Sequence, residues 1–200
     1  MSGTAVSAAH IAPFAVWIAL MTVLPPTAGM YAVRTAATVA ALVYSAWVLK
    51  PRLSSAAAAR ALAWGVPAGL FVLAVWVLPE RIPAVQDFYR RFFIYGEGGT
   101  AAVDSSGPAL LAVRLCGSAF VISVAEELFF RRWLIGFAGF WCSLALFAVE
   151  HDRWLVAAVA GLVYSALALR KGLASAIAAH AVTNLALGVY VLVSGDWIFW

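Results

Sequence analysis

The chain has 200 residues, of which 65% are hydrophobic and 11% are charged, and its formal net charge is +4. Soluble domains average about 45 to 50% apolar and about 25% charged residues, so this composition indicates a polytopic membrane protein. Its positive charges are scattered rather than gathered in a stripe, which argues against a nucleic-acid partner. Cys116 and Cys142 lie in apolar segments without CxxC spacing, so neither a disulfide framework nor a structural zinc site is expected.

Prolines, glycines and charged residues divide the chain into apolar runs, which predict an all-α transmembrane bundle of about seven helices, within a range of six to eight. The expected boundaries are 8–24, 31–49, 57–78, 109–136, 140–151, 154–169 and 173–193. The first run ends at Pro25-Pro26 without a small-residue cleavage site, so we expect a membrane helix there rather than a removable signal. Residues 1–200 are expected to form a single integral membrane domain.

The segment from Pro79 to Pro108 is the one long polar connection between these runs. Its first part, 87–93, interleaves aromatic and basic residues, which suits a short helix lying in the lipid headgroup layer. An ordinary loop with an aromatic belt is the alternative. Its second part contains the glycines of 96–99. Both alternatives place the segment at the membrane surface.

Basic residues cluster at three places, which are Lys50/Arg52/Arg60, Arg131/Arg132 and Arg170/Lys171. Loops rich in lysine and arginine stay in the cytoplasm, so these clusters predict an N-in, C-out orientation. The expected location is a bacterial cytoplasmic membrane. Glu150 is among the acidic residues that this arrangement assigns to the opposite surface.

Two adjacent glutamates, Glu126 and Glu127, lie in the middle of a long apolar run. Ionisable side chains inside a membrane are costly and usually functional. Arg131 follows Glu127 by four residues, which is the spacing of a favourable helical ion pair. Glu127 is therefore expected to remain ionised in a structural pair, and Glu126 is the candidate base that activates water.

The other strongly polar groups at comparable depth are His151, His180 and Asn184. A helix rises 1.5 Å per residue, so Glu126 lies about 15 Å before the turn near 136–139 and His151 lies about 18 Å after it. Because the two helices are consecutive and run in opposite directions, Glu126 and His151 should lie at a similar depth and meet. His180 and Asn184 are four residues apart and share one helix face. If Glu126 and His151 activate water against a peptide carbonyl, His180 and Asn184 can stabilise the oxyanion that forms.

Three ordered motifs carry a family resemblance: Glu126-Glu127-xxx-Arg131, Phe147-xxx-His151 and His180-xxx-Asn184. They resemble those of the CAAX protease and bacteriocin-processing family, the membrane-embedded glutamate proteases that include the type II CAAX prenyl endopeptidases. The resemblance covers roughly residues 115–193. It implies four catalytic residues, Glu126, His151, His180 and Asn184, and it implies that Glu127 and Arg131 support the site. Phe147 is a further expected supporting residue, and no metal or other cofactor is expected.

The chain departs from the family pattern at one residue, and two of its stretches resemble one branch of the family. Arg132 stands where family members commonly have glycine. The stretches 149–154 and 195–200 resemble the CAAX-protease-related branch associated with exosortase-type sorting systems.

The expected function is that of an intramembrane endopeptidase, which cleaves a membrane-anchored protein or peptide near its anchor within the lipid bilayer. One alternative is a zinc protease in which Glu126, His151 and His180 hold the metal, although no HExxH spacing organises them. Another alternative is a non-catalytic membrane scaffold or bacteriocin-immunity protein with the same fold. The variant Glu126→Gln distinguishes this last alternative, because a binding function would survive it.

Overall fold

The structure, a computed structural model, describes residues 3–92 and 107–199, and every regular element in these ranges is a helix. Six helical stretches are long and apolar enough to cross a membrane, so the chain is a multi-pass membrane protein. The predicted all-α transmembrane bundle is therefore confirmed. Five of the stretches are α1 (Gly3–Val23), α2 (Ala28–Leu49), α3 (Ser55–Val77), α10 (Trp154–Lys171) and α11 (Leu173–Ser194).

The remaining span is a composite helix over Pro108–Ala138, in which α-helical and wider π-helical turns alternate. Its α-helical parts are α6 (Pro108–Cys116), α7 (Ser123–Glu126) and α8 (Ile135–Ala138). Its π-helical parts are η2 (Gly117–Ile122) and η3 (Glu127–Leu134). Such turns are rare and are frequently found at functional sites. The expected span of 109–136 is confirmed, but nothing in the hydrophobic pattern indicates the wider turns on either side of α7.

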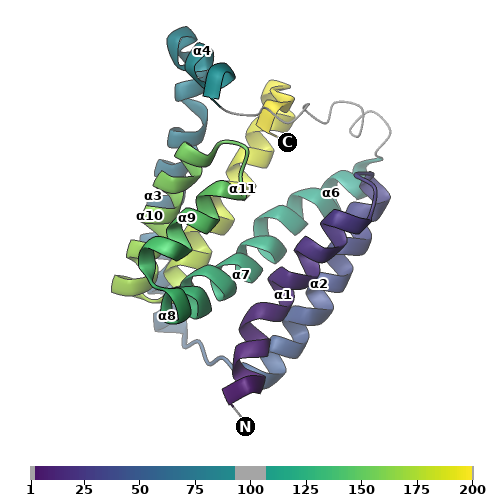
Figure 1. Ribbon diagram of the computed structural model, residues 1–200, viewed down its shortest axis with the longest axis vertical. Helices are drawn as coiled ribbons and strands as arrows, with labels where there is room; N and C mark the ends of the chain where they lie inside the picture. The colour runs from purple at the N-terminus through teal and green to yellow at the C-terminus, as the bar shows by residue number, and fades with distance from the viewer. Residues whose placement is uncertain (1–2, 93–106, 200) are drawn as a thin grey trace.

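A short helix, α9 (Phe140–Val149), follows the composite helix after a turn at Gly139, whose φ of 87° favours glycine. Its 10 residues rise about 15 Å, which is half of the roughly 30 Å hydrocarbon core of a bilayer. The helix expected over 140–151 thus ends at Val149, and residues 150–153 form a turn. Figure 1 shows this turn leading into α10 below the upper end of α11.

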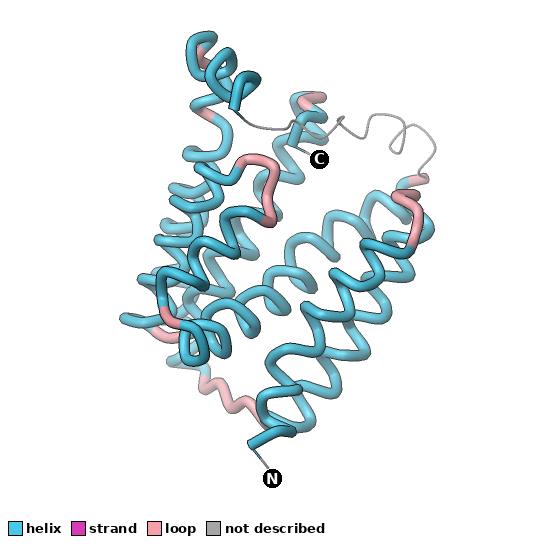
Figure 2. The backbone as a smooth tube through the Cα atoms, in the orientation of Figure 1, coloured by secondary structure: helices cyan, strands magenta, loops and turns pink. Residues whose placement is uncertain are grey.

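Short loops join α1 to α2, α2 to α3 and α9 to α10, as Figure 2 shows. The chain therefore runs back and forth, with its N-terminal end and residues 50–54 at one end of the molecule and its C-terminal end at the other (Figure 1). Arg131 does not contribute to a surface cluster, because it is only 6% exposed; that part of the charge prediction is wrong. The other basic residues of these clusters are exposed, namely Lys50, Arg52, Arg60, Arg132, Arg170 and Lys171. Arg60, Arg170 and Lys171 line one pocket together with Leu53, in the segment 50–54 near the N-terminal end of the molecule.

The helix expected in the headgroup layer corresponds to α4 (Pro83–Phe92), which follows a short 3-10 turn, η1 (Pro79–Arg81). Tyr89 of α4 is buried against Val156 of α10, and Trp76 of α3 packs on the same cluster. The segment is therefore a helix rather than the alternative loop, and protein covers part of its apolar face. Residues 93–106, which include the glycines of 96–99, lie outside the described residues.

Helices α3 and α11 approach closely because two glycines of α3 face α11. A Cβ atom at Gly65 would lie 2.5 Å from the Ala178 Cβ, and one at Gly69 would lie 2.5 Å from the Ala179 carbonyl oxygen. Small residues permit such approach between membrane helices. The Thr183 hydroxyl also donates to the Gly69 carbonyl over 3.0 Å. This contact fixes α11, the helix that carries His180 and Asn184.

Candidate active site

Glu127 and Arg131 form a buried ion pair within η3. Glu127 Oε1 lies 3.2 Å from Arg131 Nη1, and the two side chains are 0% and 1% exposed. The pair has the i,i+4 spacing expected from the sequence. The Arg131 guanidinium also lies 3.9 Å from the centre of the Phe147 ring, which is a cation–π distance. Phe147 of α9 is thus in direct contact with the ion pair.

His180 of α11 faces both glutamates. Its Nδ1 lies 3.0 Å from Glu127 Oε1, and its Nε2 lies 3.7 Å from Glu126 Oε2. A carboxylate oxygen accepts hydrogen bonds, so Nδ1 carries the hydrogen of the shorter contact. The Tyr164 ring stacks on the imidazole, with centroids 4.7 Å apart, and keeps its plane fixed. His180 therefore binds Glu127 and presents its second nitrogen to Glu126.

Glu126 lies at the end of α7 and is buried, with 7% of its surface exposed. Its Oε2 atom is buried and has no hydrogen-bond partner among the described residues. Buried polar atoms are usually hydrogen-bonded, so this oxygen is available to a water molecule or a substrate group. Glu127 also has a buried Oε2 without a hydrogen-bond partner among the described residues, but its Oε1 contacts both Arg131 and His180, whereas Glu126 has only the longer 3.7 Å contact with His180 Nε2.

His151 and Glu150 join Glu126 from the turn between α9 and α10. One carboxylate oxygen each of Glu126 and Glu150 and one ring nitrogen of His151 lie within 4.8 Å of one another. The His151 Nδ1 donates to the Phe147 carbonyl over 2.8 Å, because a carbonyl oxygen can only accept. In the neutral ring, Nε2 then carries the lone pair and can accept a proton.

The charges of His151 and Glu150 follow from their burial in this turn, which lies outside the six candidate spans. Burial lowers the pKa of the His151 imidazole to about 4, so the ring is neutral at pH 7. Burial, followed by the negative charge of Glu126, raises the pKa of the Glu150 carboxyl well above its usual range. At pH 7, Glu126 therefore has a neutral imidazole beside it, and the raised pKa of Glu150 favours the protonated form of that carboxyl.

Glu126, Glu150 and His151 are also the group of described residues that can offer three donor atoms to one metal ion. Carboxylate oxygens and an imidazole nitrogen suit zinc. This set differs from the zinc set considered from the sequence, because Glu150 takes the place of His180. Glu150 is exposed as a residue, as expected from the sequence, but its side chain is only 20% exposed and its carboxylate reaches Glu126, which the sequence interpretation did not anticipate. Its position immediately before His151 is the signal that points to it.

Asn184 lies one turn beyond His180 on α11. Its Nδ2 donates to the Ser118 carbonyl of η2 over 2.9 Å. A carboxamide carries two N–H groups, so a second N–H remains for another acceptor. This bond joins α11 to the composite helix two turns before Glu126.

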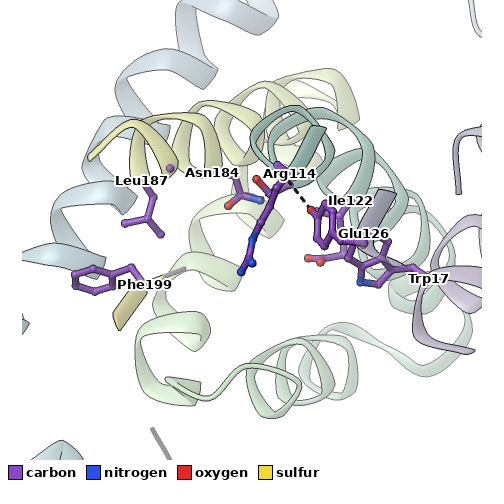
Figure 3. Close-up of a pocket in the computed structure, with 10 residues that line it drawn as sticks. Trp17, Arg114, Ile122, Glu126, Asn184, Leu187 and Phe199 are labelled. Atoms are coloured by element: carbon purple, nitrogen blue, oxygen red, sulfur yellow. Dashed lines mark hydrogen bonds between the residues drawn. The ribbon is translucent and has the colours of Figure 1, made fainter. Parts of the chain in front are cut away.

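A cavity of about 300 Å³ lies beside Glu126 and Asn184. Figure 3 shows both side chains and that of Arg114 around it. A mostly apolar cavity with a few polar groups is the common form of a ligand site. His151 and His180 are not among the described residues that line it. The remaining lining residues are Trp17, Tyr31, Ser118, Ile122, Leu187, Gly188 and Phe199.

Residues 108–186 match a family model described as type II CAAX prenyl endopeptidase Rce1-like. Residues 108–186 are therefore similar to the domain of this family, and they lie within a multi-span helical membrane protein. The matched range includes the four candidate catalytic residues Glu126, His151, His180 and Asn184. A search of curated proteins and a search of solved structures each found no match to the chain.

Proposed function

We propose that this chain is an intramembrane endopeptidase that hydrolyses a peptide bond near the membrane anchor of a protein or peptide substrate. The observation that carries the proposal is the convergence of Glu126, His151 and His180 from three separate parts of the chain, beside a cavity that Asn184 also lines. The family of the matched domain supports a protease. In this proposal residues 1–200 form one integral membrane domain with a catalytic core over about 115–193.

In the proposed reaction, Glu126 takes a proton from water while the water oxygen bonds to the carbonyl carbon of the peptide. The buried Oε2 of Glu126, which has no hydrogen-bond partner among the described residues, suits this task. His151 accepts a hydrogen bond from the same water at Nε2, because its Nδ1–H is held by the Phe147 carbonyl. The C–N bond then breaks, and the leaving nitrogen takes the proton from Glu126.

His180 and Asn184 stabilise the oxyanion in this proposal. Asn184 has a second N–H beyond the one that it donates to Ser118. His180 donates from Nδ1 to Glu127 and places Nε2 3.7 Å from Glu126, so it is the second group beside the reacting carbonyl. Arg131 balances the charge of Glu127, so the supporting pair adds no net charge to the site.

The proposed orientation is N-in and C-out in a bacterial cytoplasmic membrane. It rests on the exposed basic residues gathered at the end of the molecule that contains the N-terminal end. The cavity is lined by Phe199, which lies toward the opposite end of the molecule. Substrate therefore enters from the non-cytoplasmic side, and it is a protein or peptide that has already been carried across the membrane.

Replacing Glu126 with glutamine tests the assignment of the base. The amide keeps the shape of the side chain but cannot take the proton of water, so Glu126→Gln is expected to abolish hydrolysis without lowering the melting temperature. Purified protein in detergent is assayed against a library of lipid-anchored fluorogenic peptides, and its melting is followed in parallel. Asp87→Asn is the matched control, because it removes a carboxylate that is 70% exposed on α4 and should leave hydrolysis unchanged.

Three other outcomes separate the alternatives. Wild-type hydrolysis by the Glu126→Gln protein would reject the role of Glu126. A partner protein retained equally by both forms, with no hydrolysis by either, would identify a non-catalytic scaffold. A strong chelator is expected to leave hydrolysis unchanged; loss of activity that added zinc restores would instead assign Glu126, Glu150 and His151 to a metal site.

A further inference from the structure

A second cavity, of about 480 Å³, lies between the N-terminal half of α3, the end of α10 and the beginning of α11. It shares no described lining residue with the cavity beside Glu126. Three positively charged residues line it, Arg60 of α3 and Arg170 and Lys171 of α10, and all three are exposed. The proposed hydrolysis uses none of them. This basic cavity is therefore a separate feature of the molecule, near its N-terminal end (Figure 1).

The described part of the chain offers these three cations no carboxylate partner. Residues 1–79 and 153–195, which include all three helices around the basic cavity, contain neither aspartate nor glutamate. None of the ion pairs among the described residues includes Arg60, Arg170 or Lys171. Like charges gathered around one cavity repel one another and attract counter-ions. An anion from outside the chain therefore suits this place.

An aromatic ring positions one of the three cations and indicates the depth of the cavity in the membrane. The Lys171 Nζ lies 3.9 Å from the centre of the Trp64 ring, which is a cation–π distance. Trp64 lines the basic cavity and is 48% exposed. Exposed tryptophans of membrane proteins gather where the hydrocarbon meets the lipid headgroups. The basic cavity is therefore expected at the level of the lipid phosphates.

The beginning of α11 adds backbone donors to the same cavity. The first three residues of this helix, Leu173, Ala174 and Ser175, line the basic cavity. The Ser175 N–H donates to the Gly172 carbonyl over 3.0 Å, and the Ser175 hydroxyl donates to the Lys171 carbonyl over 3.4 Å. The N–H groups of Leu173 and Ala174 have no acceptor within their helix. The positive end of the α11 dipole therefore adds to the charge of the side chains.

We propose that the basic cavity binds a phosphate group, which an anionic lipid of the surrounding membrane leaflet presents. Guanidinium groups bind phosphate oxygens through paired hydrogen bonds, and an ammonium group binds them as a point charge. Basic pockets between membrane helices are suited to such headgroups. Leu53 and Trp64 line the same cavity and suit the apolar part of the lipid. A bound phosphate therefore links α3, α10 and α11, and the proposal does not depend on the proposed hydrolysis.

Lipid binding to the purified protein in neutral detergent tests the site without an assay of hydrolysis. The probes are phosphatidylglycerol, whose headgroup is anionic, and phosphatidylcholine, whose headgroup is zwitterionic, with identical acyl chains. Native mass spectrometry gives the affinity of the first bound lipid. We expect phosphatidylglycerol to bind about tenfold more tightly, as for one hydrogen-bonded contact between charged groups. The double variant Arg170→Gln/Lys171→Gln should reduce this preference to less than about twofold.

A matched double variant controls for net charge. Arg52→Gln/Arg132→Gln removes two exposed arginines that do not line the basic cavity, so it should keep the full preference. Arg60→Gln removes one charge from the α3 side and should give an intermediate preference. Equal affinities of the two lipids for the wild-type protein would overturn the site. Equal loss of preference in the two double variants would also overturn it, because the effect would then follow net charge.

Soluble phosphates distinguish the lipid from a free phosphate compound. Sodium phosphate and glycerol 3-phosphate offer the same anionic group without acyl chains. At the concentration of the lipid, neither should displace phosphatidylglycerol, because the apolar contacts beside Trp64 favour the lipid. Displacement that depends on Arg170 and Lys171 would assign the basic cavity to a soluble phosphate compound and reject the lipid.

Discussion

The Glu127–Arg131 ion pair is the buried contact whose loss should affect stability most directly. Glu127→Ala and Arg131→Ala should each cost about 3 to 5 kcal/mol, because each leaves the other charge buried without its partner. Both variants should melt at lower temperature in detergent and lose activity. The double variant Glu127→Gln/Arg131→Met removes both charges at similar volume and should melt closer to wild type. Unchanged melting of both single variants would show that the pair does not stabilise the fold.

Asn184 should affect the chemical step more than substrate binding. An oxyanion donor acts mainly in the transition state, so Asn184→Ala is expected to lower kcat by roughly 100-fold to 1,000-fold with a smaller change in KM. Leu187→Ala is the control, because Leu187 lines the same cavity with an apolar side chain and should change mainly KM. A change in KM alone for Asn184→Ala would make Asn184 a ground-state contact.

Among single residues, the sequence predicted contacts that depend on local helix geometry. The spacing of Glu127 and Arg131 indicated their pairing, because an i,i+4 relation is fixed within one helix. Glu150 could not be placed in the same way. The approach of its carboxylate to Glu126 depends on where α9 ends and how the following turn packs, and no local pattern encodes that packing. The grouping of Arg60 with Arg170 and Lys171 around one cavity likewise depends on packing between helices.

The α3–α11 contact gives a prediction for whole helices. Gly69→Ala would place a Cβ 2.5 Å from the Ala179 carbonyl oxygen and 2.8 Å from the Val182 Cβ, so the helices must separate. Overpacking of this kind costs about 1 to 3 kcal/mol, and displacement of α11 moves His180 as well. We therefore expect both a lower melting temperature and lower activity.

The matched control for Gly69→Ala is Gly29→Ala in α2. A Cβ at Gly29 meets no atom within 4 Å, and alanine is the better helix former. This variant should melt at or slightly above the wild-type temperature and keep full activity. If Gly69→Ala behaves in the same way, the close approach of α3 and α11 is not required for the fold.

At the level of elements, hydrophobic runs located the spans, because membrane thickness sets a minimum helix length. The same signal carries no information about hydrogen-bond register. The change from α-helical to π-helical turns at η2 and η3 therefore went unpredicted. The hydrophobic pattern also did not predict that α9 ends at Val149. The expected helix continued to residue 151, whereas Glu150 and His151 lie in the turn that follows α9.

The orientation of the whole molecule can be measured with single cysteines. Cys116 and Cys142 are exposed, so both are first replaced by alanine. An impermeant thiol reagent applied to intact cells should label cysteines at positions 152 and 196 and leave those at 52 and 171 unlabelled. Position 152 gives the clearer result, because Asp196 is ion-paired with Arg81 and its replacement disturbs that contact.

The reverse labelling pattern would overturn the N-in orientation and return substrate entry to the cytoplasm. Labelling at all four positions would indicate that the cells are leaky, so a cytoplasmic control protein with one exposed cysteine is treated in parallel. The catalytic assignments do not depend on this outcome, because the contacts among Glu126, His151 and His180 are the same in either orientation.

The short α9 has a consequence for the supply of water. Irregular backbone at membrane depth is tolerated only where protein buries it or water reaches it. Helix α9 ends after only 10 residues, and Asp152 in the turn that follows it is exposed. Every hydrolytic cycle consumes one water molecule, which the hydrocarbon around the other helices does not provide. In the proposed reaction, the exposed turn at Asp152 is therefore the place where water can reach the site, one residue from His151.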